Sequence, residues 1–267
     1  MSSSRFAKAG DTLERLVENS FRAIDDGAYE LKRSVSHDAI SVKKAIFACK
    51  HAPLITEVKF ASPSRGKIRE VGTPAEIAIA MEEAGATALS ILTQPYMFDG
   101  SLGNLLAVRK AVSIPLLMKD IVVSEVQIDA AKQAGADCVL LIKAVFDRDL
   151  AESGIEKLHE YALRRELNVL VEAHSEREYA DCLSANYELV GINNRNLADL
   201  KIDMANTERL IKKLGKGKSV VISESGIAKP ADIQYLRSAG ADAFLVGTSI
   251  METDDIGAKV RELYNAL

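Results

Sequence analysis

The sequence predicts an α/β protein, a single (β/α)8 TIM barrel behind an N-terminal helical extension. Short apolar runs alternate with longer amphipathic segments from Pro53 onward, a pattern typical of parallel strands joined by helices. The triplet Ala-Gly-Ala begins at residues 84, 134 and 239, so its copies are 50 and 105 residues apart. Both spacings are near multiples of a unit of roughly 25 residues, and eight such units make a barrel. No linker divides the chain, so we expect one domain over residues 1–267, with 1–50 as the extension.

The extension begins with a helix. Asp11 is placed to cap it, and Glu14 stands at the reciprocal position of a capping box. Gly27 is placed to end the helix. One face carries apolar residues at helical spacing: Leu13, Leu16, Val17, Phe21 and Ile24. Residues 31–50 are polar and show a second helix-like pattern.

Eight strands are expected in the remainder of the chain. The candidates are Leu54–Val58, Ala88–Leu92, Pro115–Met118, Cys138–Ile142, Asn168–Val171, Leu189–Ile192, Val220–Ile222 and Ala243–Val246. Helix-like segments between them include Pro74–Ala84, Leu102–Val112, Glu125–Ala134, Ser175–Ala185, Asn206–Leu214 and Ala231–Ala239. The glycine of each Ala-Gly-Ala triplet suits the left-handed conformation that ends a helix. A doubly wound open sheet is the alternative, but it usually has fewer strands, and no G-x-G-x-x-G follows the first run.

The composition is that of an ordinary globular protein, with 48% hydrophobic and 27% charged residues. The 34 basic and 38 acidic side chains leave a net charge of −4, so no basic excess favours nucleic acid or a membrane surface. The N-terminus does not resemble a secretory signal, and no apolar stretch approaches the roughly 18 residues of a membrane span. Cys49, Cys138 and Cys182 are too few and too scattered for a disulfide framework or a zinc site made of cysteines alone. We therefore expect a cytoplasmic protein with reduced thiols.

Polar residues that share the inward face of their strands gather at the strand ends, where the active site of a barrel lies. Five different strands contribute them: Glu57, Lys59, Lys119, Glu172, Asn193 and Glu224. A salt bridge or a solvated loop position would explain any one of these alone. Burying all six is costly unless they pair or take part in chemistry, so the set predicts acid–base catalysis.

The last two strands are followed by glycines beside hydroxyls, in Ser225-Gly226 and Gly247-Thr248. The loops after the seventh and eighth strands are the usual phosphate site of this fold, so these residues predict a phosphate site. The polar loop Ala61–Lys67 is expected to be a mobile lid over the substrate, with a plain surface loop as the alternative. The histidines are isolated, and no metal site is predicted: His37, His51, His159 and His174.

The chain resembles the indole-3-glycerol phosphate synthase family in motifs that run in the family's order from about residue 54 to 251. The segments are Glu57–Ser64, Ser90–Thr93, Phe98–Leu102, Met118–Asp120, Leu170–Glu172, Gly191–Leu197, Ser223–Ile227 and Phe244–Met251. The resemblance implies a carboxy-lyase of tryptophan biosynthesis without metal or organic cofactor. Its substrate would be 1-(2-carboxyphenylamino)-1-deoxyribulose 5-phosphate, converted to indole-3-glycerol phosphate, CO2 and water.

The resemblance also implies roles for the residues. Lys119 matches the acid that protonates the carbonyl oxygen, Lys59 the cation for the substrate carboxylate, and Glu172 the acid/base of dehydration. Which lysine acts as acid at which step stays open. Glu57 and Asn193 would orient the amine and hydroxyls, and Glu224 would hold the charge network. The substrate and phosphate shell would comprise Ser62, Lys59, Arg195, Ser225, Gly226, Gly247 and Thr248, and the apolar pocket Pro63, Phe98, Leu140 and Ile227.

The chain departs from the family at two points. Ile121 stands where the family often has an aromatic residue, and tryptophan is absent, with Phe6 as a possible substitute in the extension. Two other functions would require different residues. A phosphoribosylanthranilate isomerase would need a Cys/Asp pair at strand ends, and a non-catalytic barrel would have lost Lys119 or Glu172. We expect a phosphorylated small molecule as the binding partner, neither nucleic acid nor membrane, and a monomer or weak homodimer.

Overall fold

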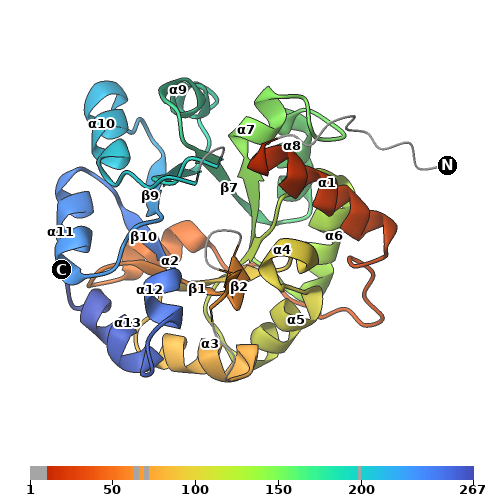
Figure 1. The fold of residues 1–267 in the computed structure, drawn as a ribbon, viewed down its shortest axis with the longest axis horizontal. Helices are drawn as coiled ribbons and strands as arrows, with labels where there is room; N and C mark the ends of the chain where they lie inside the picture. The colour runs from red at the N-terminus through yellow and green to blue at the C-terminus, as the bar shows by residue number, and fades with distance from the viewer. Residues whose placement is uncertain (1–10, 63–65, 69–71, 198–199) are drawn as a thin grey trace.

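The computed structural model describes residues 11–62, 66–68, 72–197 and 200–267, and its centre is a closed barrel of eight parallel strands (Figure 1). Around the barrel the order is β1-β10-β9-β8-β7-β6-β5-β4, which closes where β4 pairs with β1. The strands are β1 (Leu54–Val58), β4 (Ala88–Leu92), β5 (Leu116–Lys119), β6 (Cys138–Ile142), β7 (Asn168–Ala173), β8 (Leu189–Asn193), β9 (Val220–Glu224) and β10 (Ala243–Val246). The closed barrel confirms the predicted fold and excludes the open sheet.

Helices surround the barrel (Figure 1). The longer ones are α3 (Pro74–Glu83), α5 (Leu102–Ala111), α6 (Glu125–Ala134), α8 (Ile155–Arg164), α9 (Glu176–Ser184), α10 (Ala205–Leu214), α11 (Pro230–Ser238) and α13 (Ile256–Tyr264). Short helices after strand ends are α4 (Pro95–Phe98), α7 (Lys143–Asp147) and α12 (Thr248–Met251). None of the helices in the described part of the chain combines the length and the apolarity needed to cross a bilayer.

The predicted strands and helices are confirmed, with small shifts at their ends. The strand over 168–171 continues through Glu172 to Ala173, and the one over 220–222 continues to Glu224. These extensions place two of the predicted acid–base residues inside strands, where neighbouring backbones fix them. The glycines of the Ala-Gly-Ala triplets have φ of +105°, +82° and +108°, so each adopts the expected left-handed conformation.

The N-terminal segment runs from one end of the barrel to the other. Its first helix, α1 (Thr12–Asp25), is capped by Asp11, which accepts a hydrogen bond from Glu14 N at 3.1 Å. The capping box is incomplete, because Glu14 instead pairs with Arg148 after α7. Helix α1 packs beside α4 at the carboxyl ends of the strands. The chain then passes α6, where Val35 N donates to the carbonyl of Gln133, and reaches α2 (Val42–Ala48) at the other end.

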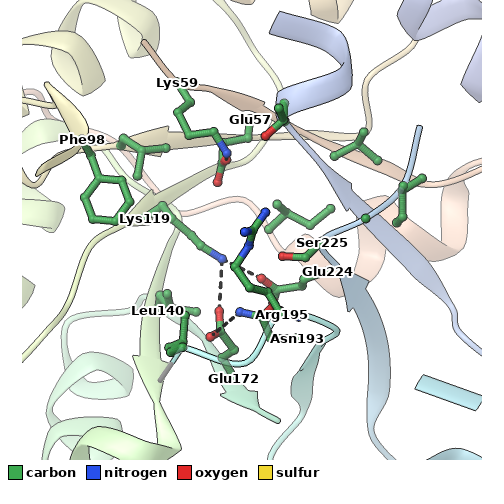
Figure 2. A pocket seen from close by; sticks show the side chains of 18 of the residues that line it. Glu57, Lys59, Phe98, Lys119, Leu140, Glu172, Asn193, Arg195, Glu224 and Ser225 are labelled. Atoms are coloured by element: carbon green, nitrogen blue, oxygen red, sulfur yellow. Dashed lines mark hydrogen bonds and ion pairs between the residues drawn. The ribbon is translucent and has the colours of Figure 1, made fainter. Parts of the chain in front are cut away.

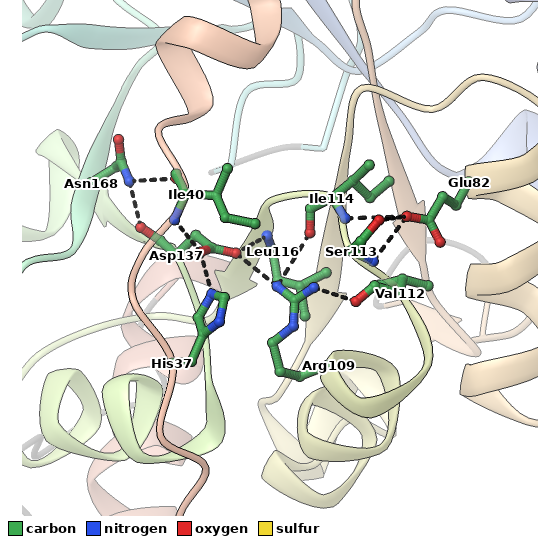
Figure 3. A network of polar contacts seen from close by, with 10 residues as sticks. All are labelled: His37, Ile40, Glu82, Arg109, Val112, Ser113, Ile114, Leu116, Asp137 and Asn168. Atoms are coloured by element: carbon green, nitrogen blue, oxygen red, sulfur yellow. Dashed lines mark hydrogen bonds and ion pairs between the residues drawn. The ribbon is translucent and has the colours of Figure 1, made fainter.

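A cluster of buried charged side chains at the amino-terminal end of the barrel holds this segment in place (Figure 3). Asp137, just before β6, is fully buried and pairs with Arg109 of α5 at 3.0 Å. Its carboxylate also accepts from Ile40 N and lies 2.7 Å from His37 Nε2. The N-terminal segment is therefore bonded directly to the end of the barrel opposite the strand ends that carry Lys119 and Glu224.

The segment after β1 forms a pair of short antiparallel strands, β2 (Ala61–Ser62) and β3 (Gly66–Lys67). Ile68 N donates to the carbonyl of Phe60 at 2.7 Å and extends this pairing. The sequence pattern gave no sign of these strands. Pro63 lies outside the described residues, as does Phe6.

Candidate active site

A cavity of about 330 Å³ opens at the carboxyl ends of the barrel strands (Figure 2). All six residues predicted from the strand ends line it: Glu57, Lys59, Lys119, Glu172, Asn193 and Glu224. The barrel register brings them together, since Asn193 of β8 pairs with Glu224 of β9, and Glu172 of β7 pairs with Gly191 of β8.

Lys119 is the centre of a buried charge cluster. Its Nζ donates to Glu224 Oε2 at 2.6 Å and to Glu172 Oε2 at 3.2 Å. The other Glu172 oxygen, Oε1, accepts from Asn193 Nδ2 at 2.9 Å. Glu224 Oε1, by contrast, is buried and has no hydrogen-bond partner among the described residues. The cluster therefore holds two carboxylates for one cation and leaves one oxygen unpaired.

This environment shifts the pKa values of the cluster. Burial lowers the pKa of Lys119, but the charges of Glu224 and Glu172 outweigh burial and raise it above its ordinary value. Burial also raises the pKa of Glu224, to about 8, with Glu172 acting in the same direction and Lys119 against it. At neutral pH the lysine is therefore cationic, and the pair of carboxyls retains a proton.

A second ion pair lies across the cavity. Lys59 Nζ donates to Glu57 Oε1 at 2.5 Å, and Ser90 Oγ donates to Glu57 Oε2 at 3.5 Å. Burial would raise the pKa of Glu57, but Lys59 and Lys119 lower it below its ordinary value. Glu57 is thus an ionised carboxylate at neutral pH, unlike the carboxyl of Glu224.

Two glycines make room for these carboxylates. A Cβ at Gly191 would overlap Glu224 Oε1, and a Cβ at Gly247 would lie 2.6 Å from Glu57 Oε1. Gly191 was not predicted to matter. Gly247 is a predicted phosphate residue, and the structure adds that its missing Cβ leaves room for the carboxylate of Glu57. The periodicity of a single strand cannot reveal either contact, because each joins residues from two different parts of the chain.

The predicted phosphate residues Ser225, Gly226, Gly247 and Thr248 all line the cavity. Ser225 and Gly226 have φ of +70° and +90°, so this turn is left-handed. Asn194 Nδ2 holds it by donating to the carbonyl of Ser225 at 3.1 Å. Ser249 Oγ donates to the carbonyl of Ile227 at 2.8 Å and joins the loops after β9 and β10. The two loops therefore form one wall of the cavity.

Arg195 also lines the cavity, from the loop after β8. Its backbone N–H donates to Asn193 Oδ1 at 2.9 Å, and its guanidinium donates to the carbonyl of Leu200 at 3.1 Å. Ser62 lies in β2, where it pairs with Gly66. No group of three or more His, Cys, Asp or Glu side chains in the described residues is arranged to hold a metal ion.

The apolar wall of the cavity contains Phe98, Leu140 and Ile227, as predicted. The cavity is also lined by residues that were not predicted to do so: Leu16, Gln94, Asp120 and Ile121. The sequence pattern places Leu16 only on the apolar face of the first helix. Its place over the cavity depends on how α1 packs against the barrel, which helical spacing does not encode.

The fold and the site together define a (β/α)8-barrel enzyme with acid–base groups at the strand ends. Two solved structures share the fold at TM-scores of 0.59: a thiamine phosphate pyrophosphorylase from Pyrococcus furiosus and an N-acetylmannosamine-6-phosphate 2-epimerase from Clostridium perfringens. Their identities are 16% and 14%, covering 80% and 81% of this chain and 95% and 93% of theirs, so they support the fold alone.

The particular family follows from the sequence comparisons. The family model for indole-3-glycerol phosphate synthase matches residues 13–263. The synthase of Methanocaldococcus jannaschii is 44% identical over 84% of this chain and 82% of its own length, and that of Bacillus cereus is 37% identical over 93% and 96%. The chain belongs to the indole-3-glycerol phosphate synthase family, whose activity is that of a carboxy-lyase in tryptophan biosynthesis.

Proposed function

We propose that the Lys119 cluster carries the chemistry by which this chain closes the indole ring. The observation that supports this most is the position of Lys119 Nζ inside the cavity, within hydrogen-bond distance of Glu172 and Glu224. The reaction joins a ring carbon of 1-(2-carboxyphenylamino)-1-deoxyribulose 5-phosphate to its carbonyl carbon, then releases CO2 and one water.

Lys119 acts on the carbonyl oxygen. As the new carbon–carbon bond forms, the carbonyl electron pair moves onto oxygen, and a cationic donor stabilises that charge. The lysine is held cationic by its two carboxylates. An alkoxide is a much stronger base than a carboxylate, so it takes the proton from Lys119 Nζ although Glu172 and Glu224 do not.

Lys59 pairs with the substrate carboxylate and holds it until decarboxylation restores the aromatic ring. Lys59 now donates to Glu57, a partner that a substrate carboxylate is able to replace at the mouth of the cavity. Glu57 then accepts a hydrogen bond from the substrate amine, and Asn193 orients the hydroxyls of the sugar chain.

Glu172 serves the final dehydration as acid and base. The leaving hydroxyl needs a proton, and a proton must leave the ring nitrogen or its neighbouring carbon. Glu172 shares its environment with Glu224, whose raised pKa keeps a proton on the pair near neutrality. The carboxyl pair therefore has a proton to give and a site to take one back.

The remainder of the substrate is bound by the cavity walls. The phosphate is held by the loops after β9 and β10, through Ser225, Gly226, Gly247 and Thr248, with Arg195 and Lys59 supplying further donors and positive charge. The aromatic ring packs against Phe98, Leu140 and Ile227. Binding of the remote phosphate positions the reacting carbons.

A direct assay tests the function. The purified chain is mixed with the carboxyphenylamino substrate, and indole fluorescence is followed; the chain has no tryptophan, so its own emission is low. Stoichiometric release of CO2 with the rise in fluorescence is expected. Fluorescence without CO2, or no reaction with a folded protein, contradicts the proposal.

The cellular location and the oligomeric state of the enzyme are also proposed. We infer a cytoplasmic location and a monomer or weak homodimer acting on a phosphorylated small molecule. The three cysteines are free, and Cys138 and Cys182 are buried, which is consistent with a reducing compartment. Sedimentation at several protein concentrations tests the oligomeric state, and a stable tetramer would contradict it.

A further inference from the structure

Asp120 is a buried carboxyl directly after the catalytic candidate Lys119, and it was not assigned any role. Only 2% of the residue is exposed. Its oxygens accept hydrogen bonds from Thr93 Oγ1 at 2.5 Å, Tyr29 OH at 2.9 Å and Ile121 N at 2.8 Å. Burial raises the pKa of this carboxyl to about 6, against the hydrogen bonds from Thr93 and Tyr29 that lower it. Among the described residues its hydrogen-bond donors are all neutral groups, so Asp120 differs from the ion-paired carboxylates of the site.

The residues that bond to Asp120 also fix the backbone at the carbonyl of Lys119 and in the loop that follows it. Thr93 N donates to the carbonyl of Lys119 at 3.2 Å, which ties the end of β4 to the end of β5. Gln127 of α6 donates from Nε2 to the carbonyl of Ile121 at 2.9 Å and accepts at Oε1 from Val123 N at 2.8 Å. Side chains from three other parts of the chain therefore hydrogen-bond to the loop that follows Lys119: Thr93, Gln127 and Tyr29.

Tyr29 brings the N-terminal segment into this network. Its hydroxyl donates to Asp120 Oδ2 and accepts from Gln127 Nε2 at 3.2 Å, and the residue is 5% exposed. Tyr29 follows α1, the helix whose Leu16 lines the cavity. One hydroxyl thus joins the segment over the cavity to the strand that carries the lysine.

We propose that Asp120 is a positioning residue for Lys119 and that Tyr29, through its hydroxyl, holds Asp120 in the orientation this requires. The inference rests on the proposed role of Lys119 as the acid. Asp120 does not touch the reacting atoms in this account, because its oxygens are occupied by Thr93, Tyr29 and Ile121. It acts by fixing the end of β5, so that Lys119 Nζ meets the carbonyl oxygen in the productive geometry.

The test is a double-mutant cycle between Tyr29→Phe and Lys119→Met. Tyr29→Phe removes one hydroxyl and keeps the buried ring, so we expect a folded protein. Its kcat should fall about tenfold with KM changed less than about twofold, since a misplaced catalytic group affects the chemical step. In the Lys119→Met background the same substitution should change single-turnover rates less than about twofold, because no acid remains to be positioned.

The matched control is Tyr161→Phe, which removes another tyrosine hydroxyl from an aspartate. Tyr161 OH lies 3.0 Å from both oxygens of Asp129, between α8 and α6 and away from the cavity. This variant should retain wild-type kcat. Asp120→Asn is expected to follow Tyr29→Phe in both backgrounds.

Two results would overturn the inference, and they are distinguishable. If Tyr29→Phe lowers the rate by the same factor with and without Lys119, the network supports the fold or another residue. If Lys119→Met itself turns over at the wild-type rate, the proposed acid is wrong, and the positioning role fails with it.

Discussion

Two clusters of buried charge lie at opposite ends of the barrel, and they are built differently. At the carboxyl ends of the strands, Lys119 bonds to Glu172 and Glu224 beside an open cavity (Figure 2). At the other end, Arg109 bonds to Asp137 among packed side chains (Figure 3). Both clusters cost desolvation energy, so the difference lies in how each is compensated.

The Asp137 cluster is fully satisfied. One carboxylate accepts from Arg109, from Leu116 N at 2.7 Å and from Ile40 N at 2.6 Å, with His37 Nε2 also in contact. Arg109 also donates to the backbone carbonyls of Val112 and Ile114, just after α5. The carboxylate of Asp137 is fully engaged by protein donors and does not bind a ligand. It instead links the N-terminal segment, α5 and the start of β5.

The Lys119 cluster is not satisfied in this way. It has two carboxyls for one cation, and Glu224 Oε1 has no partner in the described part of the chain. The comparison teaches that burial of charge alone does not mark an active site. A surplus of carboxyl groups over cations, an unpaired oxygen and an adjoining cavity together do mark one.

The largest effect is expected from breaking the satisfied cluster. Arg109→Met leaves Asp137 buried without its cation and should lower the free energy of unfolding by about 3 kcal/mol. Activity per folded molecule should stay within about twofold, because the cluster is remote from the cavity. Urea unfolding and steady-state kinetics measure the two quantities.

Lys43→Met is the control for Arg109→Met, since it removes an exposed pair with Glu188 on the same side of the molecule. An exposed pair contributes less than about 1 kcal/mol, so this variant should unfold near the wild-type midpoint. A large loss of kcat in folded Arg109→Met would show that the two clusters are coupled.

The next effect concerns the space that Glu224 occupies. Gly191→Ala adds a Cβ that overlaps Glu224 Oε1, so the carboxyl must turn away from Lys119. We expect kcat to fall about tenfold, the scale of a misplaced catalytic group. Gly103→Ala in α5, with only Ser101 Oγ near the new Cβ at 3.5 Å, is the control. Equal kinetics for the two variants would remove Glu224 from the mechanism.

The smallest effect is the pH dependence of stability. The raised pKa of Glu224, about 8 against an ordinary 4.5, means that the folded chain binds a proton that the unfolded chain has lost. The free energy of unfolding should therefore fall as pH rises through this window. Glu224→Gln should lack that fall, which we expect to be on the order of 1 kcal/mol because the cluster titrates together. Urea midpoints measured at about pH 5.5 and pH 8 test this, and parallel curves for both proteins would contradict it.

Much of the barrel could be predicted because its signals are local. Alternation along a strand placed Glu57 with Lys59 and pointed Glu172 inward, and glycines such as Gly135 marked helix ends. The short pair β2–β3 and the helices α4, α7 and α12 could not be predicted in this way. They are too brief to show a period, and contacts made after the barrel closes stabilise them.

The candidate site could be predicted as a set of residues but not as a set of contacts. Lys119 reaching both Glu172 and Glu224 depends on the register of three strands, which no single segment encodes. The contacts of Gly191 and Tyr29 are harder still to predict from the sequence, because each joins elements far apart in the chain.

The most direct test of the account is the single-turnover rate of Lys119→Met, followed by indole fluorescence. If the unsatisfied cluster carries the chemistry, this rate should fall about 100-fold or more, the usual scale for a general acid or charge stabiliser, while circular dichroism and KM stay near wild type. A rate within about fivefold of wild type would contradict the account, because the cavity would then close the ring without the lysine at its centre.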